Sequence, residues 1–176
     1  MTSKSIPTAK HILKYGILFG IASILFGVTT YLTGNYTKQG LIHLIILLVI
    51  TLSSIMAGLL MFKKNNNGYI SLGEALKISI GITLLGGFMA ILWKVMLLNV
   101  IDPEIITQIE DKHIKRIAEN SADFTQENIE RKIAITKKYT SPLRMILIAL
   151  AEDLFNGSLF GLIGGLIIRK KRDPFN

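Results

Sequence analysis

Five polar side chains interrupt otherwise apolar stretches of the sequence, and they are His43, Lys94, Glu152, Asp153 and Asn156. The two adjacent carboxylates follow Pro142 by ten and eleven residues, which is roughly 15 Å along an α-helix. An unpaired carboxylate at that depth in a bilayer costs at least about 2.5–3.5 kcal/mol. Carboxylates, an ammonium group and an imidazole at similar depth can pair with one another or carry protons or cations, so these residues form the candidate site.

Three interpretations of this group are open. In the first, Lys94 forms a structural ion pair with Glu152 or Asp153, and Asn156 supports it, because intramembrane charges usually face a partner. In the second, Lys94 and Glu152 extend along the helices to reach the outer headgroups. In the third, the group belongs to a proton or cation path. With only four short helices in the protomer, such a path would favour an oligomer.

Other chemistry finds little support in the sequence. The chain has no cysteine, which excludes disulfides, thiol catalysis and thiolate metal sites. The histidines and the Glu152–Asp153 pair lack any local metal-ligand spacing. No phosphate-binding loop, nucleophile elbow or dinucleotide motif occurs, and no nucleic-acid motif accompanies the basic residues. We expect no metal, no cofactor, no nucleic-acid partner and no enzymatic activity.

Four apolar stretches of about 20 residues must position these side chains. They cover residues 12–33, 41–62, 76–98 and 143–168. Lipid offers no partners to backbone N–H and C=O groups, so such stretches are typical of membrane-spanning helices. Ser71 and Glu74 form a capping-box pattern at the start of the third. The sequence predicts one all-α domain, residues 1–176, built as an integral membrane four-helix bundle.

The segment 99–142 is the only sizeable polar part of the chain. Asp102 and Pro103 are typical of a helix start. Isoleucines then recur on one face of the first helix, and a second, shorter helix follows. We therefore predict a long loop that contains amphipathic helices. The isoleucine face packs on protein, lies on the outer leaflet or receives a partner.

Glycines recur at helical spacing along one face of the first and of the last predicted helix. They are Gly16, Gly20 and Gly27 in the first helix and Gly157, Gly161 and Gly165 in the last. Faces of small residues let helices approach each other closely in a membrane. We expect the glycine face of the last helix to pack against the first or the third helix.

Basic residues gather at alternate ends of the apolar stretches. They precede the first stretch, follow the second at Lys63 and Lys64, and follow the fourth at 169–172, whereas the connection after the first holds only Lys38. The positive-inside rule then places both termini in the cytoplasm and the 99–142 loop outside. The basic run at 169–172 is expected to attract anionic lipid headgroups, at about 1 kcal/mol per basic residue.

Several of these features together resemble a family of small four-span bacterial membrane proteins, mostly from the Bacteroidota, catalogued as a domain of unknown function. The resemblance lies in the glycine-rich first helix around Tyr15 and Gly16, residues 69–77, the Asp102-Pro103-Glu104 start of the polar loop, and the glycine-rich last helix with its basic tail. It implies a four-span topology and an inner-membrane location. The family has no established activity, so it implies no catalytic residues.

The sequence favours a non-enzymatic interaction or accessory protein of the inner membrane. The motive is the presence of several packing faces together with the absence of a catalytic motif. Its partners would be membrane lipids and either another membrane protein or further copies of the chain. The alternative is a small oligomeric channel or transporter that uses Lys94, Glu152 and Asp153. A lipid-acting enzyme assembled from scattered residues is a third reading.

Overall fold

A computed structural model describes residues 7–38, 40–119, 126–139 and 141–170 of the protein. Within these residues there are six α-helices and no β-strand. The helices are α1 (Thr8–Leu32), α2 (Leu41–Asn65), α3 (Leu72–Met96), α4 (Glu104–Glu119), α5 (Gln126–Tyr139) and α6 (Pro142–Ile168), and the π-helical turn η1 (Leu97–Ile101) extends α3. The all-α prediction is confirmed.

Four of these helices are long and apolar enough to cross a membrane: α1, α2, α3 with η1, and α6. They coincide with the four predicted stretches, so the chain is a multi-pass membrane protein built on a four-helix bundle. The helix starts follow local chemistry. The Ser71 hydroxyl accepts a hydrogen bond from the Glu74 N–H (3.2 Å), and the Glu74 carboxylate accepts one from the Ser71 N–H (2.8 Å). This capping box begins α3 at Leu72, four residues before the apolar stretch.

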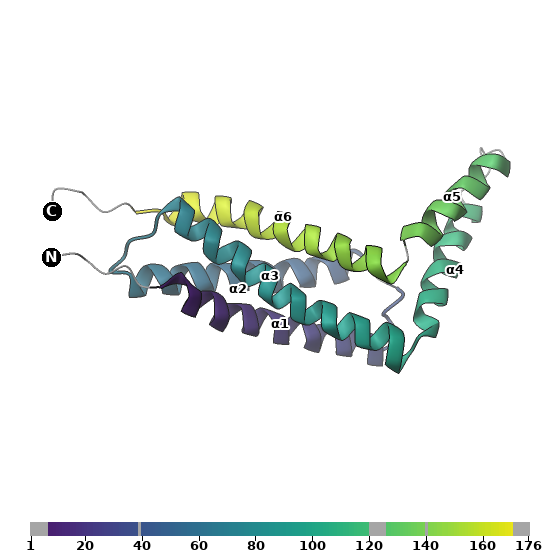
Figure 1. The fold of residues 1–176 in the computed structure, drawn as a ribbon, viewed down its shortest axis with the longest axis horizontal. Coiled ribbons are helices and arrows are strands. Elements are labelled where there is room, and N and C mark those ends of the chain that lie inside the picture. The colour runs from purple at the N-terminus through teal and green to yellow at the C-terminus, as the bar shows by residue number, and fades with distance from the viewer. Residues whose placement is uncertain (1–6, 39, 120–125, 140, 171–176) are drawn as a thin grey trace.

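α3 is the central helix of the bundle. It contacts α1, α2 and α6, whereas α1 and α6 lie on either side of it and do not contact each other in the described residues (Figure 1). Both glycine faces pack on α3. A Cβ atom at Gly16 would lie 2.8 Å from the Leu85 side chain, and one at Gly161 would lie 2.8 Å from the Ser79 Cβ. The glycine face of α6 was expected to pack against the first or the third helix, and it packs against the third, α3.

The half of the bundle where α1 begins and α6 ends, here called the terminal half, holds the main core. Its fully buried residues include Ile55, Leu59, Phe62, Ile78 and Ile82. Backbone hydrogen bonds between Ile70 and Lys170 (3.1 and 3.0 Å) tie the α2–α3 turn to the end of α6. Within the basic run, Arg169 and Lys170 are exposed, and residues 171 and 172 lie outside the described residues.

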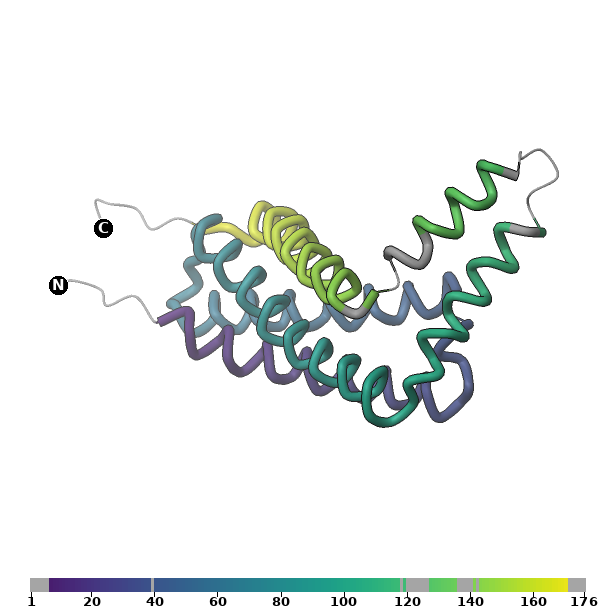
Figure 2. Tube along the Cα trace, turned by 45° about the vertical axis from the view of Figure 1, so that its right-hand side comes forward, coloured from purple at the N-terminus to yellow at the C-terminus, as the bar shows by residue number. Residues whose placement is uncertain are grey.

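α4 and α5 form a hairpin that leaves the opposite end of the bundle at an angle (Figures 1 and 2). We call the adjoining part of the bundle the hairpin half. Leu97, Leu98 and Ile105 form a second buried cluster at the base of the hairpin. The Lys112 ammonium group donates a hydrogen bond to the Thr37 carbonyl oxygen, which fastens α4 to the α1–α2 loop. The predicted amphipathic helices of the long loop are confirmed, and the apolar face of α4 is used for packing.

Candidate functional site

A partly open cavity lined by both apolar and polar side chains, here called the polar cavity, lies between the four spanning helices in the hairpin half. Its volume is about 320 Å³. The five predicted site residues all line it, with His43 on α2, Lys94 on α3, and Glu152, Asp153 and Asn156 on α6. Side chains from three separate helices thus meet in one space.

The two carboxylates occupy different positions in the polar cavity. The Asp153 carboxylate lies directly on Gly87 of α3, where a Cβ atom would overlap it. The absence of a side chain at Gly87 therefore leaves the space that the Asp153 carboxylate of α6 occupies. Glu152, one residue earlier, is exposed and also lines the cavity. We place it at the mouth of the cavity.

Lys94 faces these acids without bonding to them directly. It is half-buried, and it interacts electrostatically with Glu152. Among the described residues, no ion pair within 4.0 Å joins Lys94 to Glu152 or Asp153. The structural ion pair therefore stays a prediction. All three side chains line the polar cavity together with residues of α1 and α2.

Two further polar groups on the wall of the cavity lack a hydrogen-bond partner in the described residues. They are the buried Ser23 Oγ on α1 and the buried Trp93 Nε1 on α3. A Cβ atom at Gly27 would lie 2.8 Å from Trp93 Nε1, so the indole is wedged against α1. Leaving a buried donor unpaired costs about 1–3 kcal/mol. Neither residue was predicted to be in the site. The available signal was a tryptophan directly before a lysine within an apolar stretch.

α2 separates from the rest of the bundle beside the polar cavity. Residues 44–49 are six consecutive apolar residues, and each is between 36% and 61% exposed. None of the six is fully buried by protein, and the least exposed of them, Leu47, lines the polar cavity. His43, just before it, is held by the Phe26 ring of α1 at a centroid distance of 4.7 Å. Lipid or another protein must cover the remaining surface.

The polar cavity is closed toward the terminal half. There, Ser79, Ile82 and Thr83 of α3 are fully buried. Gly157 of α6 packs so closely that a Cβ atom would lie 2.9 Å from the Ile80 Cα. The described residues therefore leave the cavity in one half of the bundle only.

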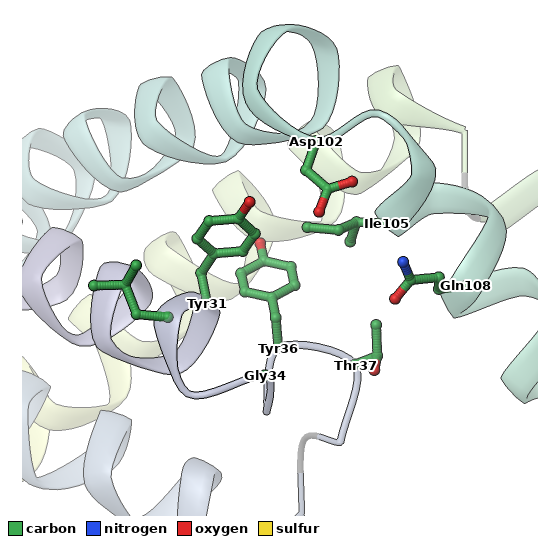
Figure 3. A pocket seen from close by; sticks show the side chains of 8 residues that line it. Tyr31, Gly34, Tyr36, Thr37, Asp102, Ile105 and Gln108 are labelled. Atoms are coloured by element: carbon green, nitrogen blue, oxygen red, sulfur yellow. The ribbon is translucent and has the colours of Figure 1, made fainter.

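A second pocket, of about 380 Å³, lies at the base of the hairpin between the loop after α1 and the start of α4. In Figure 3 the Asp102 carboxylate points toward the rings of Tyr31 and Tyr36, and Thr37 and Gln108 lie at the other end. Burial raises the pKa of the Tyr36 phenol, so its deprotonation requires a higher pH than that of an exposed tyrosine. Tyr36 also lines the polar cavity, so the two spaces share one wall residue.

The chain was compared with protein families, curated proteins and solved structures. The family described as "Protein of unknown function (DUF4199)" matches residues 14–170. The chain belongs to this family. No curated protein and no solved structure matches it.

The segment matched by DUF4199 contains every residue that lines the polar cavity, together with the whole hairpin. The predicted resemblance to a membrane family of unknown function is thereby confirmed. DUF4199 membership brings no activity with it, so function must be argued from the geometry.

Proposed function

We propose that the protein is a non-enzymatic interaction or accessory protein of the bacterial inner membrane, and that the hairpin binds its partner. The observation that carries this proposal is the position of the hairpin. α4 and α5 extend away from the bundle, while the Leu97–Leu98–Ile105 cluster and Lys112 hold their base (Figure 2). A supported arm outside the spanning helices can present side chains to a partner at little cost in ordering entropy.

Both helices of the hairpin expose charged side chains. Asp111 and Lys115 of α4 are exposed, as are Glu127 and Arg131 of α5. Charges of both signs favour a polar partner, because complementary charge sets orientation and speeds association. The glycine faces that first suggested an accessory role do not support it, since both are used inside the protomer on α3.

Site-specific photo-crosslinking tests the proposal. A photoreactive residue at Lys115 or at Arg131 should yield adducts with one and the same membrane or envelope polypeptide. The same residue at Lys77, which is exposed at the other end of α3, serves as the control and should not yield that adduct. Adducts at Lys77 alone, or no adduct from the hairpin in intact cells, would contradict the proposal.

We also propose that both termini lie in the cytoplasm and the hairpin lies outside. The distribution of basic residues supports this orientation. The chain contains no cysteine, so a single introduced cysteine reports its own side of the membrane. A membrane-impermeant maleimide should label Lys115→Cys in spheroplasts and Lys64→Cys only after lysis. The opposite labelling pattern would show that the termini lie outside and the hairpin lies in the cytoplasm.

A small oligomeric channel or transporter is the second candidate, and the polar cavity favours it. Lys94, Glu152 and Asp153 come together there from two helices. Conduction would require the closed terminal half to open or an oligomer to supply the rest of the path. Proteoliposomes test this directly. Proton or cation flux that is lost in the Glu152→Gln/Asp153→Asn variant would support transport over the accessory role.

A further inference from the structure

We propose that the polar cavity is a binding site for a zwitterion, that is, a molecule with an ammonium group and an anionic group a few bonds apart. The headgroup of an amine-bearing phospholipid has this chemistry, and so does its water-soluble counterpart. This inference is independent of the hairpin and its partner.

The groups that can bind the anion lie on one side of the polar cavity. Lys94 and Trp93 belong to α3, and Ser23 belongs to the neighbouring α1. Trp93 Nε1 and Ser23 Oγ are buried without a partner in the described residues, and Lys94 has no acid within 4.0 Å there. An ammonium, an indole N–H and a hydroxyl are all hydrogen-bond donors. Lys94 can pair with an anion in the cavity, whereas Trp93 Nε1 and Ser23 Oγ are enclosed by protein and would reach that anion only after a side-chain movement.

The groups that can bind the ammonium lie across the cavity on α6. Asp153 projects over Gly87, and Glu152 stands at the mouth. Neither has a hydrogen bond or an ion pair within 4.0 Å in the described residues. Carboxylates accept hydrogen bonds only, so they complement the donor side.

The placement of the charged groups favours a zwitterion over a simple ion. Lys94 lies on one wall of the cavity, and the carboxyl groups of Glu152 and Asp153 lie on another. A simple anion could pair only with Lys94, and a simple cation could pair only with the carboxyl groups. A zwitterion can pair with both walls at once.

The size and access of the cavity fit a small headgroup. A volume of about 320 Å³ equals the space of about ten water molecules in the liquid. In the described residues α1 and α6 are not packed against each other, and residues 44–49 of α2 are each at least 36% exposed. An acyl chain can therefore lie along α2 while its headgroup occupies the cavity. A water-soluble zwitterion would instead need no contact with α2.

Trp93 makes the test possible, because it is the only tryptophan in the chain and lies in the cavity wall. The protein in uncharged maltoside micelles would be titrated with phosphatidylethanolamine and, separately, with glycerophosphoethanolamine, while Trp93 emission is recorded. Phosphatidylglycerol supplies the anion without the amine, and ethanolamine supplies the amine without the anion. Equilibrium dialysis, or the lipid retained after gel filtration, measures binding independently of fluorescence.

We expect at least one of the two zwitterions to bind at least tenfold more tightly than either single-charge probe. Binding of the lipid alone identifies the membrane as the source of the ligand, and binding of the soluble headgroup identifies the aqueous side; both support the site. Equal binding of phosphatidylglycerol or ethanolamine, or no binding of either zwitterion, would overturn the proposal.

Near-isosteric variants separate a binding role from a structural one. Lys94→Met should weaken zwitterion binding at least tenfold and shift the preference toward ethanolamine. Glu152→Gln/Asp153→Asn should shift it toward phosphatidylglycerol. Lys77→Met, an exposed lysine of the same helix outside the cavity, should leave binding unchanged. If both cavity variants keep the wild-type preference while eluting as folded protein, the proposal fails.

Discussion

The terminal half and the hairpin half of the bundle are built from the same four helices but are packed in opposite ways. In the terminal half, α3 carries small residues and isoleucines, and α1 and α6 press their glycines onto it. In the hairpin half, Lys94 of α3 and Asp153 of α6 line one cavity, and residues 44–49 of α2 are only partly covered by protein. Glycine lets membrane helices close together, whereas charged side chains require polar partners. One half of the bundle is therefore tightly packed, and the other half contains the polar cavity.

The largest expected effect tests the close packing of α1 on α3. A Cβ atom at Gly86 would lie 2.7 Å from the Gly16 carbonyl oxygen and 2.9 Å from the Gly20 nitrogen, and backbone atoms cannot swing aside. We expect Gly86→Ala to lower the free energy of unfolding by about 3 kcal/mol, measured by circular dichroism during denaturation with sodium dodecyl sulfate in mixed micelles.

Gly73→Ala is the matched control for this substitution. Gly73 lies in the first turn of α3, with no atom within 4 Å of its added Cβ. It should be neutral, or stabilising by up to about 1 kcal/mol, because alanine loses less entropy in a helix. Equal losses at Gly86 and Gly73 would mean that close helix approach does not stabilise the bundle.

The neighbouring glycine should respond more weakly, because it faces α6 and the polar cavity and not the backbone of α1. A Cβ atom at Gly87 meets the Asp153 carboxylate, which is the end of a flexible side chain. We expect Gly87→Ala to cost about 1 kcal/mol and to change Trp93 emission as the carboxylate moves within the cavity. A loss as large as that for Gly86→Ala would show that the cavity-facing side of α3 is packed as tightly as its α1-facing side.

A double-mutant cycle tests whether the charges of the polar cavity are coupled. Lys94→Ala should destabilise the wild type by about 1 kcal/mol more than it destabilises the Glu152→Gln/Asp153→Asn background. The reason is that removing the ammonium leaves the acids without an opposite charge. The free energy of unfolding of the four proteins gives this coupling. Identical losses in both backgrounds would show that Lys94 is independent of the acids.

The smallest expected effect concerns Tyr36, whose side chain joins the polar cavity to the pocket of Figure 3. Burial raises the pKa of this phenol in the folded protein. Its contribution to stability is therefore complete below the unfolded pKa of about 10 and is lost as the pH rises through the folded value. The difference in unfolding free energy between wild type and Tyr36→Phe should shrink above about pH 10. A constant difference up to pH 12 would contradict the burial of this group.

The sequence by itself determined the solvent of this chain and the limits of its helices. In lipid, the backbone N–H and C=O groups of a long uncharged stretch must pair with one another, and an α-helix achieves this. The four spanning helices could therefore be predicted, as could the capping box at Ser71. These properties depend on residues close together in sequence. The predicted site residues are polar or charged residues within apolar stretches. Such residues can be recognised in the sequence without knowing which residues they contact in the fold.

Only the tertiary structure decided which helix is central and where the cavity lies. Glycine spacing says that a face can be approached closely but does not say by which helix, and α1 and α6 both offered such a face to α3. Ser23 and Trp93 resemble ordinary membrane residues in the sequence, and only the packing of the described residues shows that their polar atoms are buried without partners. Contacts between distant segments depend on the shapes of both surfaces at once, which no local pattern encodes.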